Sequence, residues 1–333
     1  MDTSKQNRIF YYDNLRFFLI AAVVIGHFVE VVLSQSVMYK SIFLWIYAFH
    51  MPMFLYLSGM FHKNDKVLPK VMRFVMIGFA LKIFRFLEAL ILNGHATISY
   101  FKQGGLPWFM FVLAGYTLLS YILRKFDKRY ILIFAIILGL FSGYDSSLGD
   151  LFYASRFIVF YPFFVLGEMT SPDMMLKTVQ KKWVRLIGIL AIAVWTAICV
   201  FKLDSVYILR LLFSGRNPFG DNFGEWAFLY RGLCYVITVI VGFGVMCLIP
   251  KKRIPIVSLF GSRTMQVYFW HYTFLSVLLY FHVDAALCTN RIGKLVWLLI
   301  AVAVTFITSI KIFGFPTNQI VNACRYVKNR NAE

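Results

Sequence analysis

The sequence predicts an all-α integral membrane protein, a bundle of about ten transmembrane helices with both termini in the cytoplasm. Of its 333 residues, 60% are hydrophobic and 19% are aromatic, whereas soluble domains contain about 45–50% apolar residues. Apolar stretches alternate with short polar connections that are in turn rich and poor in basic residues. No polar stretch is long enough to bury a core of its own, so residues 1–333 are expected to form a single membrane domain.

The apolar stretches are the candidate spans. They are expected at 14–34, 41–61, 71–92, 107–124, 130–142, 156–170, 183–201, 228–249, 264–282 and 293–313. A helix needs about 20 residues to cross a bilayer core of about 30 Å. The fifth and sixth stretches are shorter, so we expect them to be tilted, re-entrant or flanked by buried loops.

Basic residues mark the connections expected in the cytoplasm. They are Lys5, Arg8, Lys63, Lys66, Lys70, Arg73, Arg124, Lys125, Lys128, Arg129, Lys177, Lys181, Lys182, Arg185, Lys251, Lys252, Arg253, Arg263, Arg325, Lys328 and Arg330. The positive-inside rule then predicts that the chain crosses the cell membrane many times, with an even number of spans. The net charge of +19 is explained by this topology and by contact with anionic lipid, and no nucleic-acid partner is expected.

Several classes of site are not indicated. The five cysteines lack CxxC spacing and lie mostly within spans, so neither a metal site nor a disulfide framework is expected. The sequence has no Walker loop, no GxGxxG turn and no HExxH pair. No internal repeat of the kind found in transporters is visible.

The first apolar stretch carries two ionisable residues on one helix face. Arg16 and His27 are separated by eleven positions, which is about three helical turns plus 20°, or roughly 16 Å along the axis. We expect Arg16 at the cytoplasmic interface and His27 near the middle of the bilayer. Ionisable groups inside a membrane cost roughly 2.5–3.5 kcal/mol each on insertion scales, so the pair indicates a reaction or transport site.

Two carboxylates flank this pair. Asp13 lies three residues before Arg16 and is placed to hold its guanidinium. Glu30 lies three residues after His27, where a carboxylate would select one tautomer of the imidazole and strengthen it as a base. The alternatives are that Arg16 only snorkels to the membrane surface and that His27 is a buried structural histidine.

The second stretch contains a histidine beside a proline. Pro52 interrupts the helical hydrogen bonds and predicts a kink, and kinked membrane helices often line cavities. His50 is expected at the depth of His27, either in the site or satisfying the backbone that Pro52 frees. Arg156, Glu168 and His271 are further polar groups within spans, and each must find a partner inside the bundle.

Several motifs together resemble one family. Arg16 followed by ten residues and His27 matches the R-x10-H signature of the membrane acyltransferase family called acyltransferase-3. Further similar motifs are Phe49-His50-Met51-Pro52-Met53-Phe54 with Ser58-Gly59, Lys70-Val71-Met72-Arg73, Trp108-Phe109, Phe160-Tyr161-Pro162-Phe163-Phe164-Val165-Leu166-Gly167, and Gly261-Ser262-Arg263-Thr264 with Tyr268 and His271. The sequence departs from the pattern at Lys70, where an arginine is common, and at Gly78, near a position where many members have a proline.

The resemblance implies an O-acyltransferase that takes an acyl group, acetyl above all, from cytoplasmic acyl-CoA. It implies a carbohydrate acceptor, a sugar hydroxyl of a glycan or glycan precursor, and no metal. Its expected catalytic residues are His27, Glu30 and Asp13, and its expected donor-binding cations are Arg16, Lys70 and Arg73. The residues expected to contact substrate are His50, Ser58, Trp108, Arg156 and His271.

Two other functions remain open from the sequence. A proton-coupled secondary transporter or flippase would use Arg16, His27, Glu30 and Glu168 to relay protons or bind an anionic solute. A non-catalytic membrane subunit of a polysaccharide assembly complex is the third reading, and the oligomeric state is not specified. The long polar connection at 203–227 is expected outside, either in acceptor recognition or as a simple lid.

Overall fold

The computed structural model describes residues 10–97, 105–149, 151–216 and 218–330, and within these ranges the regular structure is helical without strands. The predicted N-terminal cations Lys5 and Arg8 lie outside the described residues. The longer helices are α1 (Phe10–Glu30), α2 (Val37–Tyr47), α3 (His50–Met60), α4 (Val67–Asn93), α5 (Trp108–Ile122), α6 (Lys128–Phe141), α7 (Ala154–Glu168), α9 (Lys182–Phe201), α12 (Ala227–Leu248), α14 (Thr264–Tyr280), α16 (Arg291–Thr308) and α17 (Thr317–Arg330).

Short helices connect the long ones. They are α8 (Pro172–Val179), α10 (Leu203–Val206), α11 (Arg210–Phe213), α13 (Pro255–Gly261), α15 (Val283–Leu287) and the 3-10 turns η1 (Leu33–Gln35), η2 (Ser142–Tyr144), η3 (Leu151–Tyr153), η4 (Tyr207–Leu209) and η5 (Lys311–Gly314).

Each predicted apolar stretch coincides with a helix or a pair of helices. Within the described residues, five helices are long and apolar enough to cross a membrane: Phe10–Glu30, Val37–Met60, Lys182–Phe201, Ala227–Leu248 and Arg291–Thr308. Helices α6 and α7 have 14 and 15 residues and are about 21–22 Å long, which is as short as the sequence indicated. The count of about ten spans and the cytoplasmic termini stay predictions.

The first helix begins and ends earlier than expected. The prediction of a span over 14–34 is wrong at both ends, because α1 covers Phe10–Glu30 and the chain then turns into η1. Val32 is fully buried after the helix has ended, so the apolar run continues because this turn packs in the core. His27 therefore lies in the last turn of α1 and not in its middle.

The second predicted span is broken as its proline suggested. The chain leaves the helical path at Phe49, and Pro52 follows in the first turn of α3. Proline has no N–H to donate to the carbonyl four residues earlier. The hydroxyl of Thr238 in α12 donates to that carbonyl of Ala48 at 2.6 Å. The break is thus stabilised by a neighbouring helix, as membrane kinks require.

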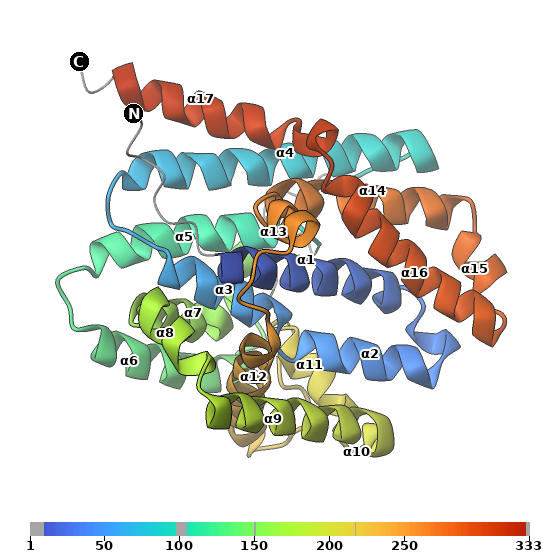
Figure 1. The fold of residues 1–333 in the computed structure, drawn as a ribbon, viewed down its shortest axis with the longest axis horizontal. Helices are drawn as coiled ribbons and strands as arrows, with labels where there is room; N and C mark the ends of the chain where they lie inside the picture. Colours follow the sequence, from blue (N-terminus) through green and yellow to red (C-terminus); the bar gives the residue numbers. More distant parts are fainter. Residues whose placement is uncertain (1–9, 98–104, 150, 217, 331–333) are drawn as a thin grey trace.

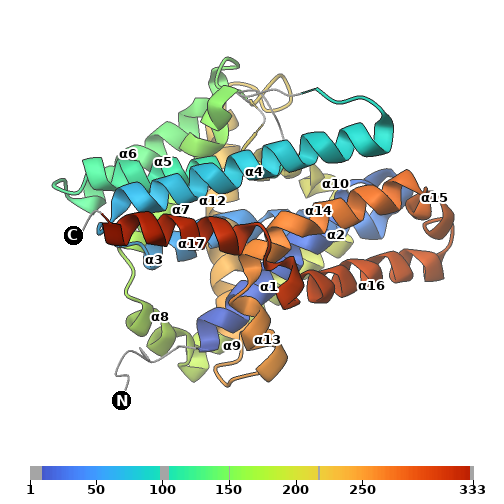
Figure 2. The ribbon, with the colours of Figure 1, turned by 90° about the horizontal axis from the view of Figure 1, so that it is seen from above.

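Helix α1 runs through the centre of the bundle (Figure 1) and packs against α2, α3, α13, α14 and α16. Helices α4 and α17 lie side by side on one flank in both views (Figures 1 and 2), and α9 packs against α12 on the other. Helix α1 and helices α13, α14 and α16, which are far apart in sequence, therefore pack together in the bundle.

Glycines of the predicted motifs permit close helix contacts. A Cβ atom on Gly59 of α3 would lie 2.0 Å from the carbonyl oxygen of Phe164 in α7, and one on Gly167 would lie 2.1 Å from that of Tyr56. A Cβ atom on Gly261 of α13 would lie 1.8 Å from the carbonyl oxygen of Asp13. Small residues let membrane helices approach at backbone distance, so these glycines fix α3 on α7 and α13 on α1.

Connections with basic residues meet at the start of α1. The amide of Asn14 donates to the carbonyls of Pro250 and Lys252 at 2.9 and 3.0 Å, and it accepts from Ser258 at 2.6 Å. The hydroxyl of Tyr12 donates to the carbonyl of Pro172 at 2.6 Å. The structure therefore gathers loops that the charge pattern assigned to one side of the membrane.

Candidate active site

Two cavities lie along one face of α1. One has a volume of about 690 Å³ and contains Arg16 in its wall; the other has a volume of about 710 Å³ and contains His27. We call them the Arg16 cavity and the His27 cavity. The residues predicted to share a helix face therefore do so, and each faces an open space.

The Arg16 cavity is lined by cations, a carboxylate and apolar side chains. The guanidinium of Arg16 lies 3.5 Å from Asp13, as predicted, and its carbon lies 4.9 Å from the ring centroid of Phe61. Arg73 of α4 lines the same cavity, with its guanidinium 4.9 Å from the ring of Phe74. Ser58 also lines this cavity, and its hydroxyl donates to the carbonyl of Phe54 at 2.8 Å.

Lys70 lies apart from these two cations. Its ammonium donates to the Asp65 carboxylate at 2.7 Å and to the carbonyl of Lys63 at 2.6 Å. The hydrogen bond from Lys70 to the Asp65 carboxylate and the positive charge of Lys70 lower the pKa of Asp65. Lys70 is not among the described residues that line the Arg16 cavity, so the structure brings Arg16 and Arg73 together but not Lys70.

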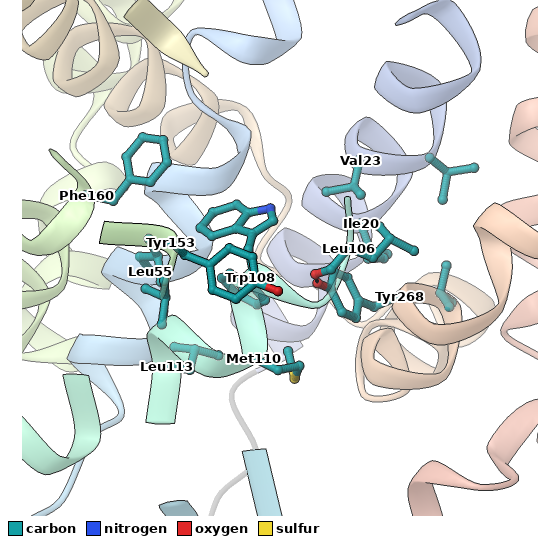
Figure 3. Close-up of a cluster of buried hydrophobic side chains, with 14 of the residues drawn as sticks. Ile20, Val23, Leu55, Leu106, Trp108, Met110, Leu113, Tyr153, Phe160 and Tyr268 are labelled. Carbon is teal, nitrogen blue, oxygen red and sulfur yellow. Dashed lines mark hydrogen bonds between the residues drawn. The ribbon is translucent and has the colours of Figure 1, made fainter. Parts of the chain in front are cut away.

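Three residues line both cavities and form their junction: Val23 of α1, Met51 of α3 and Tyr268 of α14. Figure 3 shows Tyr268 next to Val23 and Ile20, with its hydroxyl directed to the backbone of Leu106. That hydroxyl donates a hydrogen bond to the Leu106 carbonyl. The two cavities are therefore adjacent, and we call the border formed by Val23, Met51 and Tyr268 the neck.

His27 is paired with Glu30 at the other side of this neck. Nδ1 of His27 lies 3.2 Å from Oε2 of Glu30, and the hydroxyl of Tyr47 donates to the same oxygen at 2.6 Å. A carboxylate only accepts hydrogen bonds, so Nδ1 carries a proton, and in the neutral imidazole Nε2 is then the nitrogen with the lone pair. The predicted contact between His27 and Glu30 is present.

Aromatic rings surround the His27 imidazole. The His271 ring stacks on it at 5.4 Å between centroids, and the Tyr272 ring meets it edge-on at 5.7 Å. Nδ1 of His271 donates to the carbonyl of Val267 at 2.8 Å, and its buried Nε2 has no hydrogen-bond partner. His271 is fully buried and packs against the His27 ring. It is not among the described residues that line the His27 cavity.

The other predicted substrate residues also have clear positions. His50, Trp108 and Arg156 line the His27 cavity. Nδ1 of His50 donates to the carbonyl of Ile46 at 2.9 Å. This is not the Ala48 carbonyl that Pro52 leaves free, which accepts from Thr238 instead, and His50 also lines the cavity. The guanidinium of Arg156 lies over the Trp108 ring, 4.7 Å from its centroid.

Glu168 belongs to a separate contact. Its carboxylate accepts hydrogen bonds from Lys128 of α6 at 2.7 Å and from Ser120 of α5. These two contacts join α7 to α5 and α6. It lines neither cavity among the described residues. A proton relay through Arg16, His27, Glu30 and Glu168 would therefore have to leave the two cavities to reach its last member.

The connection at 203–227 folds back over the His27 cavity. Tyr207, Arg210, Ser214 and Arg216 line it. The buried guanidinium of Arg231 in α12 donates to the carbonyl of Leu212 at 2.6 Å and holds the segment in place. This segment, left open by the sequence as recognition element or lid, is a wall of the cavity in the structure.

Some site residues escaped sequence reasoning. The hydroxyl of Tyr47 donates to Glu30. Tyr47 lies three residues before the predicted site residue His50, and this short spacing was the available signal for it. In α4, Arg85 pairs with Glu88 and lies over the ring of Tyr272, 4.4 Å from its centroid. Charged residues in the middle of an apolar stretch were the available signal for this second pair.

The comparison with protein families agrees with the motifs. The model of the acyltransferase domain, acyltransferase family 3, matches residues 9–314, a range that contains both cavities' central residues and every quoted motif. No curated protein and no solved structure matches the chain. The match covers nearly the whole chain, and the chain therefore belongs to the acyltransferase-3 family of membrane acyltransferases.

Proposed function

We propose that this protein is an integral membrane O-acetyltransferase that moves an acetyl group from cytoplasmic acetyl-CoA to a sugar hydroxyl of a glycan or glycan precursor. The observation that carries the proposal is the junction of the two cavities at Val23, Met51 and Tyr268. A cation-lined cavity ends there on one side, and a cavity with a His–Glu pair begins on the other.

The Arg16 cavity suits the donor. Coenzyme A carries phosphates at one end and a long, thin thioester arm at the other. Arg16 and Arg73 offer guanidinium groups that bind phosphate in two-pronged fashion. The neck is apolar and suits the uncharged arm, whose thioester would then reach the neighbourhood of His27, roughly 16 Å from Arg16 along α1.

His27 suits the role of general base. Nε2 would take the proton of the acceptor hydroxyl as its oxygen attacks the thioester carbonyl. The carbon–sulfur bond then breaks, an ester bond forms, and the proton passes from Nε2 to the departing thiolate of CoA. Glu30 stabilises the imidazolium between these steps, and Tyr47 holds Glu30 in place.

The wall of the His27 cavity suits a sugar. Aromatic rings make up a large part of it: Phe43, Tyr47, Trp108, Phe160, Tyr207, Phe213, Tyr268 and Tyr272. Such rings offer apolar faces to the C–H faces of a pyranose, and their hydroxyl and indole groups hydrogen-bond to its hydroxyls. This composition supports a carbohydrate acceptor better than an apolar one.

Purified protein in lipid nanodiscs tests the proposal. With acetyl-CoA it should release free CoA slowly, and faster when membrane extract containing the acceptor is added. The variant His27→Ala should lose the stimulated rate by about 10²–10⁴-fold while it still binds CoA. The matched variant His95→Ala, on an exposed histidine outside both cavities, should keep it. Equal rates in both variants would contradict the proposal.

A further inference from the structure

Cations are concentrated in the wall of the His27 cavity. Lys40, Arg156, Arg210 and Arg216 line it, and Glu30 is the one carboxylate among its described lining residues. Glu30 already accepts hydrogen bonds from His27 and Tyr47. Among the described residues that line this cavity, cations therefore outnumber carboxylates four to one.

Two of these cations, Lys40 and Arg210, lie over the same aromatic ring in the cavity wall. Helix α2 runs antiparallel to α1, and Tyr47 meets Glu30 at the end of α1. Lys40 lies seven residues before Tyr47, roughly 10 Å further from the neck along the helix. The ammonium of Lys40 and the guanidinium of Arg210 both lie over the Tyr207 ring, at 5.7 and 4.6 Å from its centroid. Arg216, on the same connection as Arg210, is exposed and also lines the cavity.

Topology does not account for this cluster. The basic loops that orient the protein meet at the other end of α1, around Arg16. The His27 end is the side predicted to face outwards, where the positive-inside rule disfavours lysine and arginine. Cations that are both disfavoured by topology and directed into a cavity indicate a negatively charged ligand.

We propose that the acceptor bound in the His27 cavity carries a carboxylate or phosphate group, which Lys40, Arg210 and Arg216 hold while Arg156 lines the same cavity. This rests on the proposed acetyltransferase function and deepens it by naming the acceptor as an anionic glycan. The charged group anchors one end of the acceptor, and its reacting hydroxyl is then presented to His27.

Native membranes that contain the protein test this with acetyl-CoA labelled in the acetyl group. Because the acetyl group is uncharged, charge on the labelled product must come from the acceptor. We expect the labelled glycan to be retained on an anion-exchange column. Mild acid hydrolysis, which removes a lipid diphosphate, separates the two sources: retention afterwards identifies a charge within the glycan, and loss of retention identifies the lipid-linked phosphate.

The variants assign the binding to this cluster. Lys40→Gln combined with Arg210→Gln should lower incorporation into the anionic fraction about tenfold at limiting acceptor, with the apparent KM for acetyl-CoA unchanged. Lys202→Gln removes an exposed cation that does not line the cavity and should have no effect. Thermal unfolding of each variant separates a binding defect from misfolding.

Each contrary outcome has a distinct meaning. A labelled product that is neutral, or a double variant with normal incorporation, overturns the anionic acceptor while the transferase stands. Label from succinyl-CoA but not from acetyl-CoA would show that the cations bind a charged acyl group, which also overturns it. No label from either donor contradicts the transferase itself and this inference with it.

Discussion

The side chain of Arg16 offers the sharpest test of donor binding. Arg16→Ala should raise the apparent KM for acetyl-CoA about 10–100-fold, the loss expected for two-pronged contacts to phosphate. Arg16→Lys should recover only part of it, because an ammonium cannot form the two-pronged contact.

Lys70 serves as the matched control for this measurement. It lies on the same side as Arg16 and Arg73, but it pairs with Asp65 and stays out of the Arg16 cavity. Lys70→Gln should leave the KM for acetyl-CoA within about twofold of the original value, as expected for an exposed ion pair. A larger effect of Lys70 than of Arg16 would place the donor elsewhere.

Glu30 acts through His27 in this account, so it is a positioning residue. Glu30→Gln keeps the shape of the side chain but removes the charge that stabilises an imidazolium, and kcat should fall about 10–100-fold with little change in KM. Tyr47→Phe removes only one hydrogen bond to Glu30, so its decrease in kcat should be a few-fold smaller than that of Glu30→Gln. Glu225→Gln, on an exposed loop residue, is the control. Normal kcat in Glu30→Gln would mean that His27 works without it.

At the scale of elements, the close contact of α3 with α7 depends on glycine. Gly59→Ala would place a Cβ atom 2.0 Å from the Phe164 carbonyl oxygen, so a backbone must move. We expect a loss of about 1–3 kcal/mol, typical of overpacking, and a lower midpoint of thermal unfolding. Gly232→Ala in α12 meets its nearest atom at 3.5 Å and should be neutral. Equal midpoints for the two variants would show that α3 and α7 are not in backbone contact.

The sequence predicted elements better than their ends or their contacts. Apolar stretches located the helices because burial and membrane insertion both select apolar residues. The same fact misplaced the end of α1, since Val32 is buried in a turn and not in a helix. The spacing of Arg16, His27 and Glu30 predicted their common face because helix geometry alone sets it. Local spacing carries no information on tertiary approach, so Tyr47, Arg85 and the wall formed by 203–227 were out of its reach.

For the whole molecule, the orientation in the membrane is a prediction of the charge pattern. The five native cysteines are buried, so single added cysteines can report exposure to an impermeant thiol reagent. Asp221→Cys, in the exposed segment near the His27 cavity, should react on intact cells. Lys125→Cys, in a basic connection, should react only after permeabilisation. The reverse pattern would put Arg16 outside, away from cytoplasmic acetyl-CoA.

The proposed function requires the acyl arm to pass from the Arg16 cavity to His27 through the neck. Val23 lines both cavities and is 2% exposed, so a larger side chain there should close the passage. Val23→Trp is compared with Val23→Ala, which adds no bulk at the neck, and with Val37→Trp, which adds a tryptophan at a position that is 66% exposed.

The most direct measurement combines acetyl-CoA binding and CoA release on these purified variants, with thermal unfolding to confirm that each is folded. We expect folded Val23→Trp to bind acetyl-CoA with near-normal affinity, because the phosphates still meet Arg16 and Arg73, but to release CoA at least about 100-fold more slowly. Val23→Ala and Val37→Trp should remain active. Normal CoA release by folded Val23→Trp would show that the acyl group does not travel through the neck.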